Sequence, residues 1–544
     1  MPQQAAQPHK TSVKETLTSI MIAFIVALVF RGFVVEGFQI PTGSMGPTLL
    51  GAHVRARSPI SGYEWPVEPW VRTPGNAVAP VQLGMTPTDP MTGIELPARD
   101  YKTLSGDRVF VYKYLEPLHS PQRWDVTVFK VPTGVQENYI KRLIGMPNEQ
   151  VALVDGDVFT HANEGEPVGW EADGWSIQRK PERTQRAVFQ PVFDSEYTPR
   201  TSATFRPPFR GGTPGWSGLS DSPSYSFDRA TPTTLEWLNT VFRLDDYLPF
   251  NEMPRSGQWW SRQDGREFPV SDIAMAFGYE PDSDNSTLSV HLTARGHEFR
   301  GTIVRDAGVV TAVLQMRPKS DADAPWTTLD QAKAPGRALS ARRITRIEFW
   351  HVDQALWLFI DGRLVAGGPE KGAYDWTIGQ RLEYATGRDL LQELHDQPRL
   401  NLTNVDWYRA PSLRAEFAGS AFRLHRVRVS RDLYYRPELF TPNPNAWPGD
   451  PNTAAGNPAL ATHPDAPMLL GPDEFFFCGD NSARSLDGRL WGAAHPMVAQ
   501  KLGTGSGKVH RTMLIGRAFY VYFPSPQRRF GLPILDFGRM RWIW

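Results

Sequence analysis

"YIKRLIGMPNEQVALVDGDVFTH", residues 139–161, is the stretch that decides the fold. Residues 139–145 and 149–161 are short runs rich in β-branched and aromatic side chains, which is typical of β-strands. Inside the second run, the pair Asp155 and Gly156 suits the tight turn of a β-hairpin. The stretch therefore predicts antiparallel strands.

Runs of the same character lie on both sides of this stretch. They are residues 107–114 and 125–132 before it, and residues 475–481 and 513–524 near the end of the chain. Glycine and proline are abundant, with 46 and 48 residues, which suits a loop-rich β protein better than a helical one. The fold class that we predict is mostly β.

The sequence between residues 160 and 468 differs in composition and in its pattern of apolar residues. Proline, tryptophan and polar loops give way near residue 269 to alternating segments such as 288–304 and 346–368. The pair Asp361-Gly362 predicts another hairpin. We interpret this region as a second all-β domain that is inserted into a loop of the first.

Length, charge and cysteine content limit the number of domains, the binding partners and the cross-links that the chain can have. A chain of 544 residues has room for about two to four domains. Lys plus Arg and Asp plus Glu both number 58, so the net charge gives no indication of nucleic-acid binding. The single cysteine, Cys478, excludes an intramolecular disulfide and a multi-cysteine zinc site.

The N-terminus predicts a membrane anchor. Residues 16–35 contain one charge, Arg31, and are long enough to cross a hydrocarbon core of roughly 30 Å. Lys10 and Lys14 precede the span, so the positive-inside rule puts the N-terminus in the cytoplasm. A cleavable signal peptide and a buried core helix are the alternatives, and the bulky residues 31–39 offer no small-residue cleavage site.

Ser44 lies in "PTGSMGPTLL", residues 41–50, between a glycine and a methionine and shortly before a proline. This pattern is more typical of an accessible side chain than of a packed one. A serine needs a base to become a nucleophile, and none of the twelve histidines lies in a segment whose pattern singles it out. Lys141 lies in a strand among apolar neighbours, where burial can lower its pKa toward neutral pH. Taken alone, a strand lysine beside an arginine is more often a solvated residue.

Four segments together resemble the sequence boxes of bacterial type I signal peptidase (leader peptidase), a Ser-Lys dyad protease. They are "IPTGSMGPTL" (40–49), "GDRVFVYKY" (106–114), "YIKRLIGMPNEQV" (139–151) and "GDNSARSLDGRLWG" (479–492). Their order behind an N-terminal apolar span also matches the family. The resemblance covers about residues 10–51, 105–160 and 470–525.

The resemblance implies a membrane-bound serine endopeptidase. Such an enzyme removes N-terminal signal peptides from exported preproteins after small residues at positions −3 and −1. It implies a single-pass protein of the bacterial plasma (inner) membrane, with a cytoplasmic N-terminus and the catalytic domain on the extracytoplasmic face. The implied partners are secretory preproteins and membrane phospholipid, with no nucleic acid, no cofactor and no metal.

The resemblance also assigns roles to the residues of the dyad and the oxyanion hole. Ser44 matches the nucleophile and Lys141 matches the general base. Thr42 stands where the family uses a serine hydroxyl, which together with the backbone N–H of Ser44 forms the oxyanion hole.

The last box supplies the supporting residues. Ser485 matches a serine that orients the lysine ammonium, and Asp487 and Arg489 match a charged pair that braces the loop. The turn that brings this loop to the active site is formed by Gly479, Asp480 and Asn481.

Two departures from the family pattern stand out. Asn148 and Glu149 replace the usual glycine and aspartate, and because asparagine tolerates a left-handed conformation we expect the hairpin to persist. Residues 52–101 form a longer connection than the family has between its first two boxes, and the sequence assigns it no role.

The domain organisation follows from these segments. We expect a cytoplasmic N-terminus (1–15), a transmembrane anchor (16–35), a first catalytic part (36–160), an inserted β-rich domain (161–468, sandwich core about 220–435) and a second catalytic part (469–544). The flanks of the insert should lie close together, and we expect the catalytic core not to need the insert.

The insert itself resembles a laminin-G or concanavalin-like β-sandwich. Such folds often bind sugars or proteins, although a fold does not by itself give a function. The alternative function is therefore a membrane-anchored binding protein whose insert recognises carbohydrate or protein, with the peptidase core secondary. A self-cleaving Ser-Lys repressor should carry a DNA-binding helix-turn-helix and no membrane span, and the N-terminus argues against it.

Overall fold

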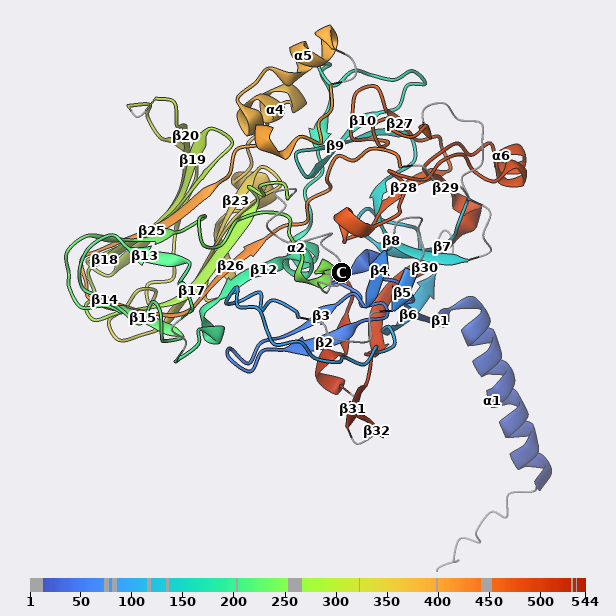
Figure 1. Ribbon diagram of the computed structural model, residues 1–544, viewed down its shortest axis with the longest axis horizontal. Coiled ribbons are helices and arrows are strands. Elements are labelled where there is room, and N and C mark those ends of the chain that lie inside the picture. Colours follow the sequence, from blue (N-terminus) through green and yellow to red (C-terminus); the bar gives the residue numbers. More distant parts are fainter. Residues whose placement is uncertain are drawn as a thin grey trace, which may run out of the picture.

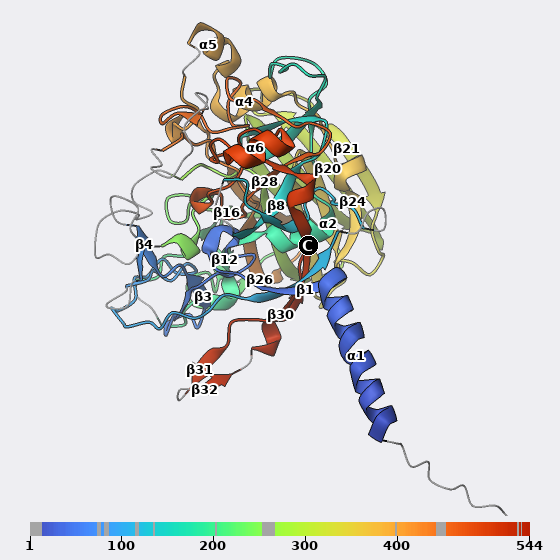
Figure 2. The same cartoon turned by 90° about the vertical axis from the view of Figure 1, so that its right-hand side faces the viewer.

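The chain is mostly β, with antiparallel sheets and one long N-terminal helix that projects from the body (Figures 1 and 2). This computed structural model describes residues 13–72, 78–80, 86–114, 119–133, 137–201, 204–252, 267–321, 323–397, 400–441, 453–529, 532–534 and 536–544. The predicted fold class, mostly β and antiparallel, is confirmed.

Helix α1 spans Val13–Phe33 and is apolar on all sides. Its 21 residues give a length of about 31 Å at 1.5 Å per residue, and its mean hydropathy reaches 2.0. Length and composition therefore suit a membrane span. The helix ends two residues before the predicted limit of 35, because Val35 begins β1 and pairs with Tyr112 of β6.

The first sheet contains eight strands. In spatial order they are β1 (Val35–Gln39), β6 (Arg108–Lys113), β30 (Leu514–Phe523), β7 (Val126–Lys130), β8 (Asn138–Gly145), β28 (Glu474–Cys478) and β29 (Lys508–His510), with β33 (Arg541–Trp542) paired to β30. In β8, Lys141 pairs with Thr127 of β7 and Arg142 pairs with Cys478 of β28. The sheet thus joins strands from both ends of the chain.

The hairpin sheet contains β9 (Glu149–Val154), β10 (Asp157–Ala162), β11 (Ser176–Ile177) and β27 (Met468–Leu469). The predicted turn is confirmed, with φ of 46° at Asp155 and 91° at Gly156. Asn148 has the expected left-handed conformation, with φ of 61°. Met468 of β27 pairs with Val151 of β9, so the two flanks of the long insertion meet as expected.

Two further sheets form a β-sandwich (Figure 1). One sheet has β14 (Trp216–Ser217), β15 (Ser224–Phe227), β26 (Phe422–Arg431), β17 (Ile273–Pro281), β22 (Thr345–Val352), β23 (Ala355–Ile360), β24 (Arg363–Gly367) and β12 (Gln190–Asp194). The other has β13 (Phe209–Gly211), β16 (Thr233–Trp237), β25 (Ser412–Ala418), β18 (Ser286–Ala294), β19 (His297–Asp306), β20 (Val309–Pro318) and β21 (Thr327–Lys333).

Alternating side chains explain why these two sheets pack together. In β17 and β19 buried positions alternate with more exposed ones, and the buried ones join a single hydrophobic core. The second predicted hairpin is also confirmed, with φ of 50° at Asp361 and 76° at Gly362. The sandwich strands begin at Gln190, earlier than the expected core of about 220–435.

Short elements complete the fold. They are the strands β2 (Val54–Arg57), β3 (Glu64–Val67), β4 (Trp70–Arg72), β5 (Val78–Pro80), β31 (Gln527–Arg529) and β32 (Leu532–Ile534), the helices α2 (Glu182–Val188), α3 (Gly368–Lys371), α4 (Ile378–Thr386), α5 (Leu390–Asp396) and α6 (Pro496–Leu502), and the 3-10 turns η1 (Gly43–Met45), η3 (Pro249–Asn251) and η7 (Ser482–Arg484). Helices α4 and α5 share a hydrophobic core with the hairpin sheet.

A buried network of charges joins the hairpin sheet to the sandwich. Asp155 Oδ2, in the hairpin turn, lies 2.6 Å from Arg295 Nε and 2.9 Å from Arg381 Nε. Arg381 also contacts Asp157, and Arg295 forms a two-fold contact with Asp272. All five side chains are buried, so removal of one partner would leave a charge uncompensated inside the protein.

Candidate active site

Ser44 lies in the turn η1 between β1 and β2. Met45, the last residue of the turn, and Leu49, which follows it, are buried in the core of the first sheet and fix the turn there. Gly106 packs so closely on this segment that a Cβ atom would lie 1.8 Å from the carbonyl oxygen of Ile40. These contacts present Ser44 half-buried at the edge of the sheet.

Lys141 reaches Ser44 from the neighbouring strand β8. Its Nζ lies 2.5 Å from Ser44 Oγ, and the lysine side chain is buried, with 3% of its surface exposed. Burial lowers the pKa of Lys141 from 10.5 to about 8, because the ammonium form loses its hydration there. The two residues that the sequence singled out are therefore brought into hydrogen-bond contact.

The carboxylates nearest to Lys141 already have arginine partners. Asp480 is paired with Arg142 at 2.7 Å, and Asp487 is paired with Arg489 at 2.9 Å, all with fully buried side chains. In the described part of the chain Lys141 consequently forms no ion pair. Asp487 and Asp480 raise its pKa, but by less than burial lowers it.

The loop that contains Gly479, Asp480 and Asn481 lies directly against residues 42–47, which we call the nucleophile turn after the role expected of Ser44. The backbone N–H of Asn481 donates to the carbonyl oxygen of Ser44 at 3.1 Å, and its side-chain Nδ2 donates to that of Gly43 at 3.1 Å. A Cβ atom at Gly479 would lie 2.4 Å from the Ser44 carbonyl oxygen, so this close approach requires glycine. The charged pair also braces the loop, since Asp487 accepts from the N–H of Gly479 at 2.9 Å.

Ser485 lies beside this turn but does not make the contact that the sequence led us to expect. Its Oγ has no hydrogen-bond partner among the described residues. It packs so closely on Gly479 that a Cβ atom at that residue would lie 2.2 Å from it. The ammonium of Lys141 is hydrogen-bonded to Ser44 instead. The expected contact between Ser485 and Lys141 is therefore not formed in this arrangement.

A cleft of about 470 Å³ opens in front of the dyad. It is lined by Pro41, Thr42, Gly43, Ser44, Glu68, Glu137, Asn138, Tyr139, Ile140, Lys141, Arg484 and Leu486. Thr42 is exposed, and its side chain does not cap η1. Glu68 and Arg484 form an ion pair of 3.1 Å at the cleft wall.

Several residues of this region escaped sequence reasoning. Glu68 belongs to the long connection 52–101, which therefore contributes to the cleft. Phe250 and Asn251, from η3 in the inserted segment, contact the nucleophile turn and the Asn481 loop. Nothing in the local pattern around residue 250 indicates these contacts, because they join segments far apart in the sequence.

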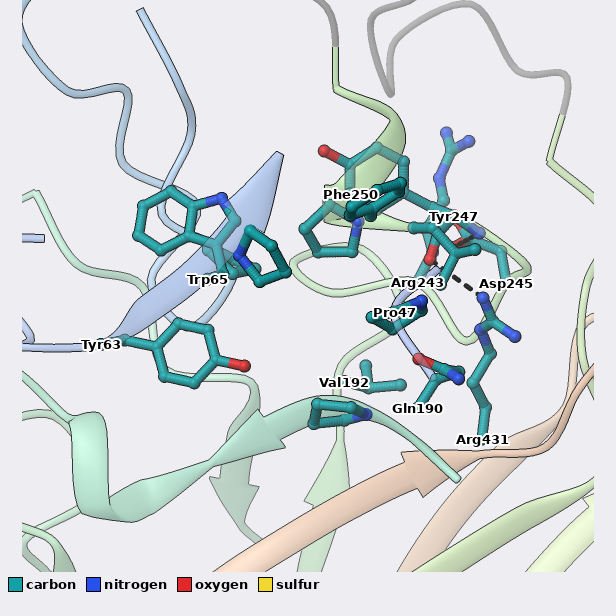
Figure 3. A pocket seen from close by; sticks show the side chains of 15 residues that line it. Pro47, Tyr63, Trp65, Gln190, Val192, Arg243, Asp245, Tyr247, Phe250 and Arg431 are labelled. Atoms are coloured by element: carbon teal, nitrogen blue, oxygen red, sulfur yellow. Dashed lines mark hydrogen bonds between the residues drawn. The ribbon is translucent and has the colours of Figure 1, made fainter. Parts of the chain in front are cut away.

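A second, smaller cavity of about 70 Å³ is lined in part by Phe250 (Figure 3). It is bordered by Pro47 of the nucleophile turn, Trp65 of β3, and Val192 and Leu248 of the inserted segment. Side chains from residues 36–160 and from the inserted segment thus face each other around this cavity.

One cluster of carboxylates has the spacing of a metal site. Oxygen atoms of Asp157, Asp353 and Asp432 lie within 4.8 Å of one another, and all three residues are buried. Lys180 Nζ lies 2.5 Å from Asp353 and 2.9 Å from Asp432. An ammonium group therefore already supplies the positive charge in this cluster.

Comparison with known proteins gives a family for part of the chain. Residues 97–197 match the family described as signal peptidase, peptidase S26, a range that includes Lys141 and leaves Ser44 outside. Signal peptidase I of Pseudomonas aeruginosa is 31% identical over 156 residues, which cover 27% of this chain and 39% of that protein. Signal peptidase I of Rickettsia typhi is 27% identical over 149 residues, which cover 27% of this chain and 43% of that protein. The chain thus spans about two fifths of the length of these relatives.

Solved structures that match the chain are β-sandwich proteins. A protein of unknown function with a galectin-like fold from Bacillus subtilis matches with 8% identity and a TM-score of 0.25, over 45% of this chain and 99% of that one. The carbohydrate-binding module CBM66 from Bacillus subtilis matches with 8% identity and a TM-score of 0.22, over 41% of this chain and 95% of that one.

Proposed function

We propose that this chain is a membrane-anchored serine endopeptidase that removes signal peptides from secretory preproteins, with Ser44 as nucleophile and Lys141 as general base. The observation that carries the proposal is the 2.5 Å contact between Lys141 Nζ and Ser44 Oγ at the wall of an open cleft. The partial match to the signal peptidase S26 family supports the same reaction class.

The lowered pKa makes Lys141 an effective base. With a pKa of about 8, about one lysine in ten is neutral at pH 7, compared with roughly one in 3,000 at the ordinary value of 10.5. Neutral Lys141 accepts the proton of Ser44 Oγ as the oxygen attacks the scissile carbonyl carbon. The resulting ammonium then donates a proton to the leaving amine, and a water molecule hydrolyses the acyl-enzyme.

The oxyanion of the tetrahedral intermediate needs donors close to Ser44. The backbone N–H of Ser44 and the hydroxyl of Thr42 are the groups that we assign to this task. N–H groups in the first turn of a helix have no acceptor within the helix, which leaves the Ser44 N–H available to a substrate oxygen.

An extended substrate has an edge to pair with. Strand β28 pairs with Arg142, Leu143 and Gly145 of β8, whereas Asn138–Lys141 line the cleft and have only β7 as a strand neighbour among the described residues. A peptide added at this edge gains main-chain hydrogen bonds and delivers its scissile bond to Ser44. Alternate side chains then enter the cleft, where small residues at −3 and −1 are selected.

Helix α1 would hold the enzyme at the membrane that also carries the substrate. We assign the N-terminus to the cytoplasm and the sheets to the extracytoplasmic face of a bacterial plasma membrane, in contact with phospholipid. A shared membrane concentrates enzyme and preprotein at one surface and lowers the entropic cost of their encounter.

The test is incubation of the detergent-solubilised full chain with a preprotein, followed by mass spectrometry of the products. We expect one cut at the end of the signal peptide, with small residues at −3 and −1, and no cut by the Ser44→Ala variant. Absence of cleavage by the wild type, or the same cut by Ser44→Ala, would refute the proposal.

A further inference from the structure

The turn η3 of the inserted segment packs on the nucleophile turn. A Cβ atom at Gly43 would lie 2.5 Å from Phe250 Cε1, and one at Gly46 would lie 2.6 Å from the same atom. The carbonyl oxygen of Phe250 accepts a hydrogen bond from the N–H of Glu68 at 2.7 Å. The position of η3 is therefore fixed from two sides by the first catalytic part of the chain.

Asn251, at the end of this turn, forms a reciprocal amide pair with Asn481. Asn251 Nδ2 donates to Asn481 Oδ1 at 2.7 Å, and Asn481 Nδ2 donates to Asn251 Oδ1 at 2.7 Å. The guanidinium of Arg484 donates to the carbonyl oxygen of Asn251 at 3.0 Å. These hydrogen bonds hold the side chain of Asn481 in one orientation, because rotation about its χ angles would break both hydrogen bonds to the Asn251 side chain.

The orientation of Asn481 matters because the same amide contacts the backbone around the nucleophile. Asn481 Nδ2 also donates to the carbonyl oxygen of Gly43, and the Asn481 N–H donates to that of Ser44. The Gly43 carbonyl and the Ser44 N–H belong to one planar peptide group and point in opposite directions when the bond is trans. A bond that fixes the Gly43 carbonyl therefore also fixes the direction of the Ser44 N–H.

We propose that Asn251, a residue of the inserted segment, is a positioning residue for the oxyanion hole: through Asn481 it holds the peptide group that aims the Ser44 N–H at the substrate oxygen. The proposal rests on the proposed function, because the oxyanion hole has a task only in acyl transfer. It makes the insert part of the active-site structure.

The expected effect is on the chemical step. Loss of one oxyanion-hole donor lowers kcat by about 10²–10³-fold, and a misaligned donor should cost part of that. We expect Asn251→Ala to lower kcat by roughly tenfold or more and to leave KM within about twofold. Lys141 is not touched, so the midpoint of the pH–rate profile should stay where it is in the wild type.

The experiment compares three variants of the full chain with the wild type. Asn251→Ala removes the amide, and Asn251→Asp keeps an acceptor for Asn481 Nδ2 and should lose less activity. Asn239→Ala is the matched control, because Asn239 is a half-buried asparagine of the insert whose side chain donates to Pro411 and makes no contact with the cleft. Thermal melting identifies any variant that fails to fold.

A pair of inhibitors separates positioning from a general loss of structure. A substrate-like peptide aldehyde forms a bond between Ser44 Oγ and its carbonyl carbon, and its oxygen then occupies the oxyanion hole. The corresponding peptide alcohol binds the cleft but cannot form this bond. For Asn251→Ala we expect the inhibition constant of the aldehyde to rise by roughly tenfold and that of the alcohol to stay unchanged.

Each outcome decides the question. Equal kcat and equal aldehyde inhibition in Asn251→Ala and Asn239→Ala, with an active wild type, would overturn the positioning role. The same holds if both inhibitors weaken equally or if KM alone changes. If the wild type cleaves no preprotein, it is the proposed function that fails, whereas Asn251 is tested only through the variants of an active enzyme.

Discussion

Two buried lysines of this protein have opposite pKa shifts. Lys141 in the cleft and Lys180 at the junction with the sandwich are both buried, and each ammonium lies 5.2 Å from the centre of an aromatic ring, that of Tyr139 or Trp124. Burial lowers the pKa in both cases. The net pKa of Lys141 nevertheless falls to about 8, whereas that of Lys180 rises above its ordinary value.

The two lysines differ in whether the neighbouring carboxylates already have a cation as partner. Around Lys180, burial lowers the pKa, but Asp353 and Asp432 contact the ammonium directly and, together with Asp157, raise the pKa by more. Around Lys141, the nearby carboxylates are paired with Arg142 and Arg489. A buried lysine of this protein thus keeps a lowered pKa where its acidic neighbours already have cations of their own.

The variant with the strongest predicted consequence is a deletion that removes the region around Lys180. Replacement of residues 165–465 by a short Gly-Ser linker deletes Lys180 and its partners but leaves Asp155 and Asp157 without Arg295 and Arg381. We expect an insoluble or inactive protein, contrary to the expectation from sequence that the core does not need the insert. Expression, solubility and preprotein cleavage are the measurements. A soluble, active deletion would show that the junction is dispensable.

Arginine substitutions at the two lysines should separate their roles. Lys141→Arg should lower the cleavage rate at least about 10³-fold, because arginine stays protonated and cannot accept the proton of Ser44. Lys180→Arg keeps a permanent cation between Asp353 and Asp432 and should retain most of the activity. Initial rates of preprotein cleavage measure both effects. An active Lys141→Arg enzyme would exclude lysine as the base.

Methionine substitutions should have opposite effects on stability. Lys180→Met leaves two buried carboxylates without their cation and should lower the free energy of unfolding by about 3–5 kcal/mol. Lys141→Met removes a group whose charged form is disfavoured by about 3 kcal/mol, from a pKa lowered from 10.5 to about 8, and should be neutral or stabilising at pH 7. Chemical denaturation of both variants and the wild type provides the comparison.

The same linkage fixes the sign of a pH effect on stability. Between pH 8 and 10.5 the unfolded state binds more protons at residue 141 than the folded state does. The stability of the wild type should therefore rise with pH across this window relative to Lys141→Met. Equal slopes for the two proteins would mean that the pKa of Lys141 is not lowered.

The most modest prediction concerns the pH at which the cleavage rate reaches half of its maximum. If neutral Lys141 is the base, the cleavage rate should rise with pH and reach half of its maximum near pH 8. Initial rates between about pH 6 and 10 at saturating substrate give this midpoint. A profile that is flat from about pH 6 to 9, or that falls, would indicate a different base.

Local patterns predicted much of the fold. Strand alternation and the Asp155-Gly156 turn predicted the hairpin, because turn geometry and side-chain alternation depend on neighbouring residues. The pairing of Ser44 with Lys141, which the structure brings together, was predicted by the resemblance of four segments to a known family, since the local pattern around Lys141 alone favours a solvated residue.

The contacts that join distant segments could not be predicted in this way. Lys180 follows Arg179 and precedes a proline, a pattern typical of an exposed turn, and its carboxylate partners lie at residues 353 and 432. The pairing of Asn251 with Asn481 depends likewise on how the insert packs. Such contacts follow from tertiary packing, on which a single sequence gives no direct information.

The pairing of β28 with β8 sets an order of events during synthesis. Arg142 and Asp480 are 338 residues apart, so the loop that braces Ser44 leaves the ribosome long after the dyad itself has been made. At 5–20 residues per second the interval is roughly 17 to 68 s, enough time for the intervening sandwich to fold as a unit. In the nascent chain Ser44 and Lys141 therefore lack the contacts of the Asn481 loop until most of the protein has been made.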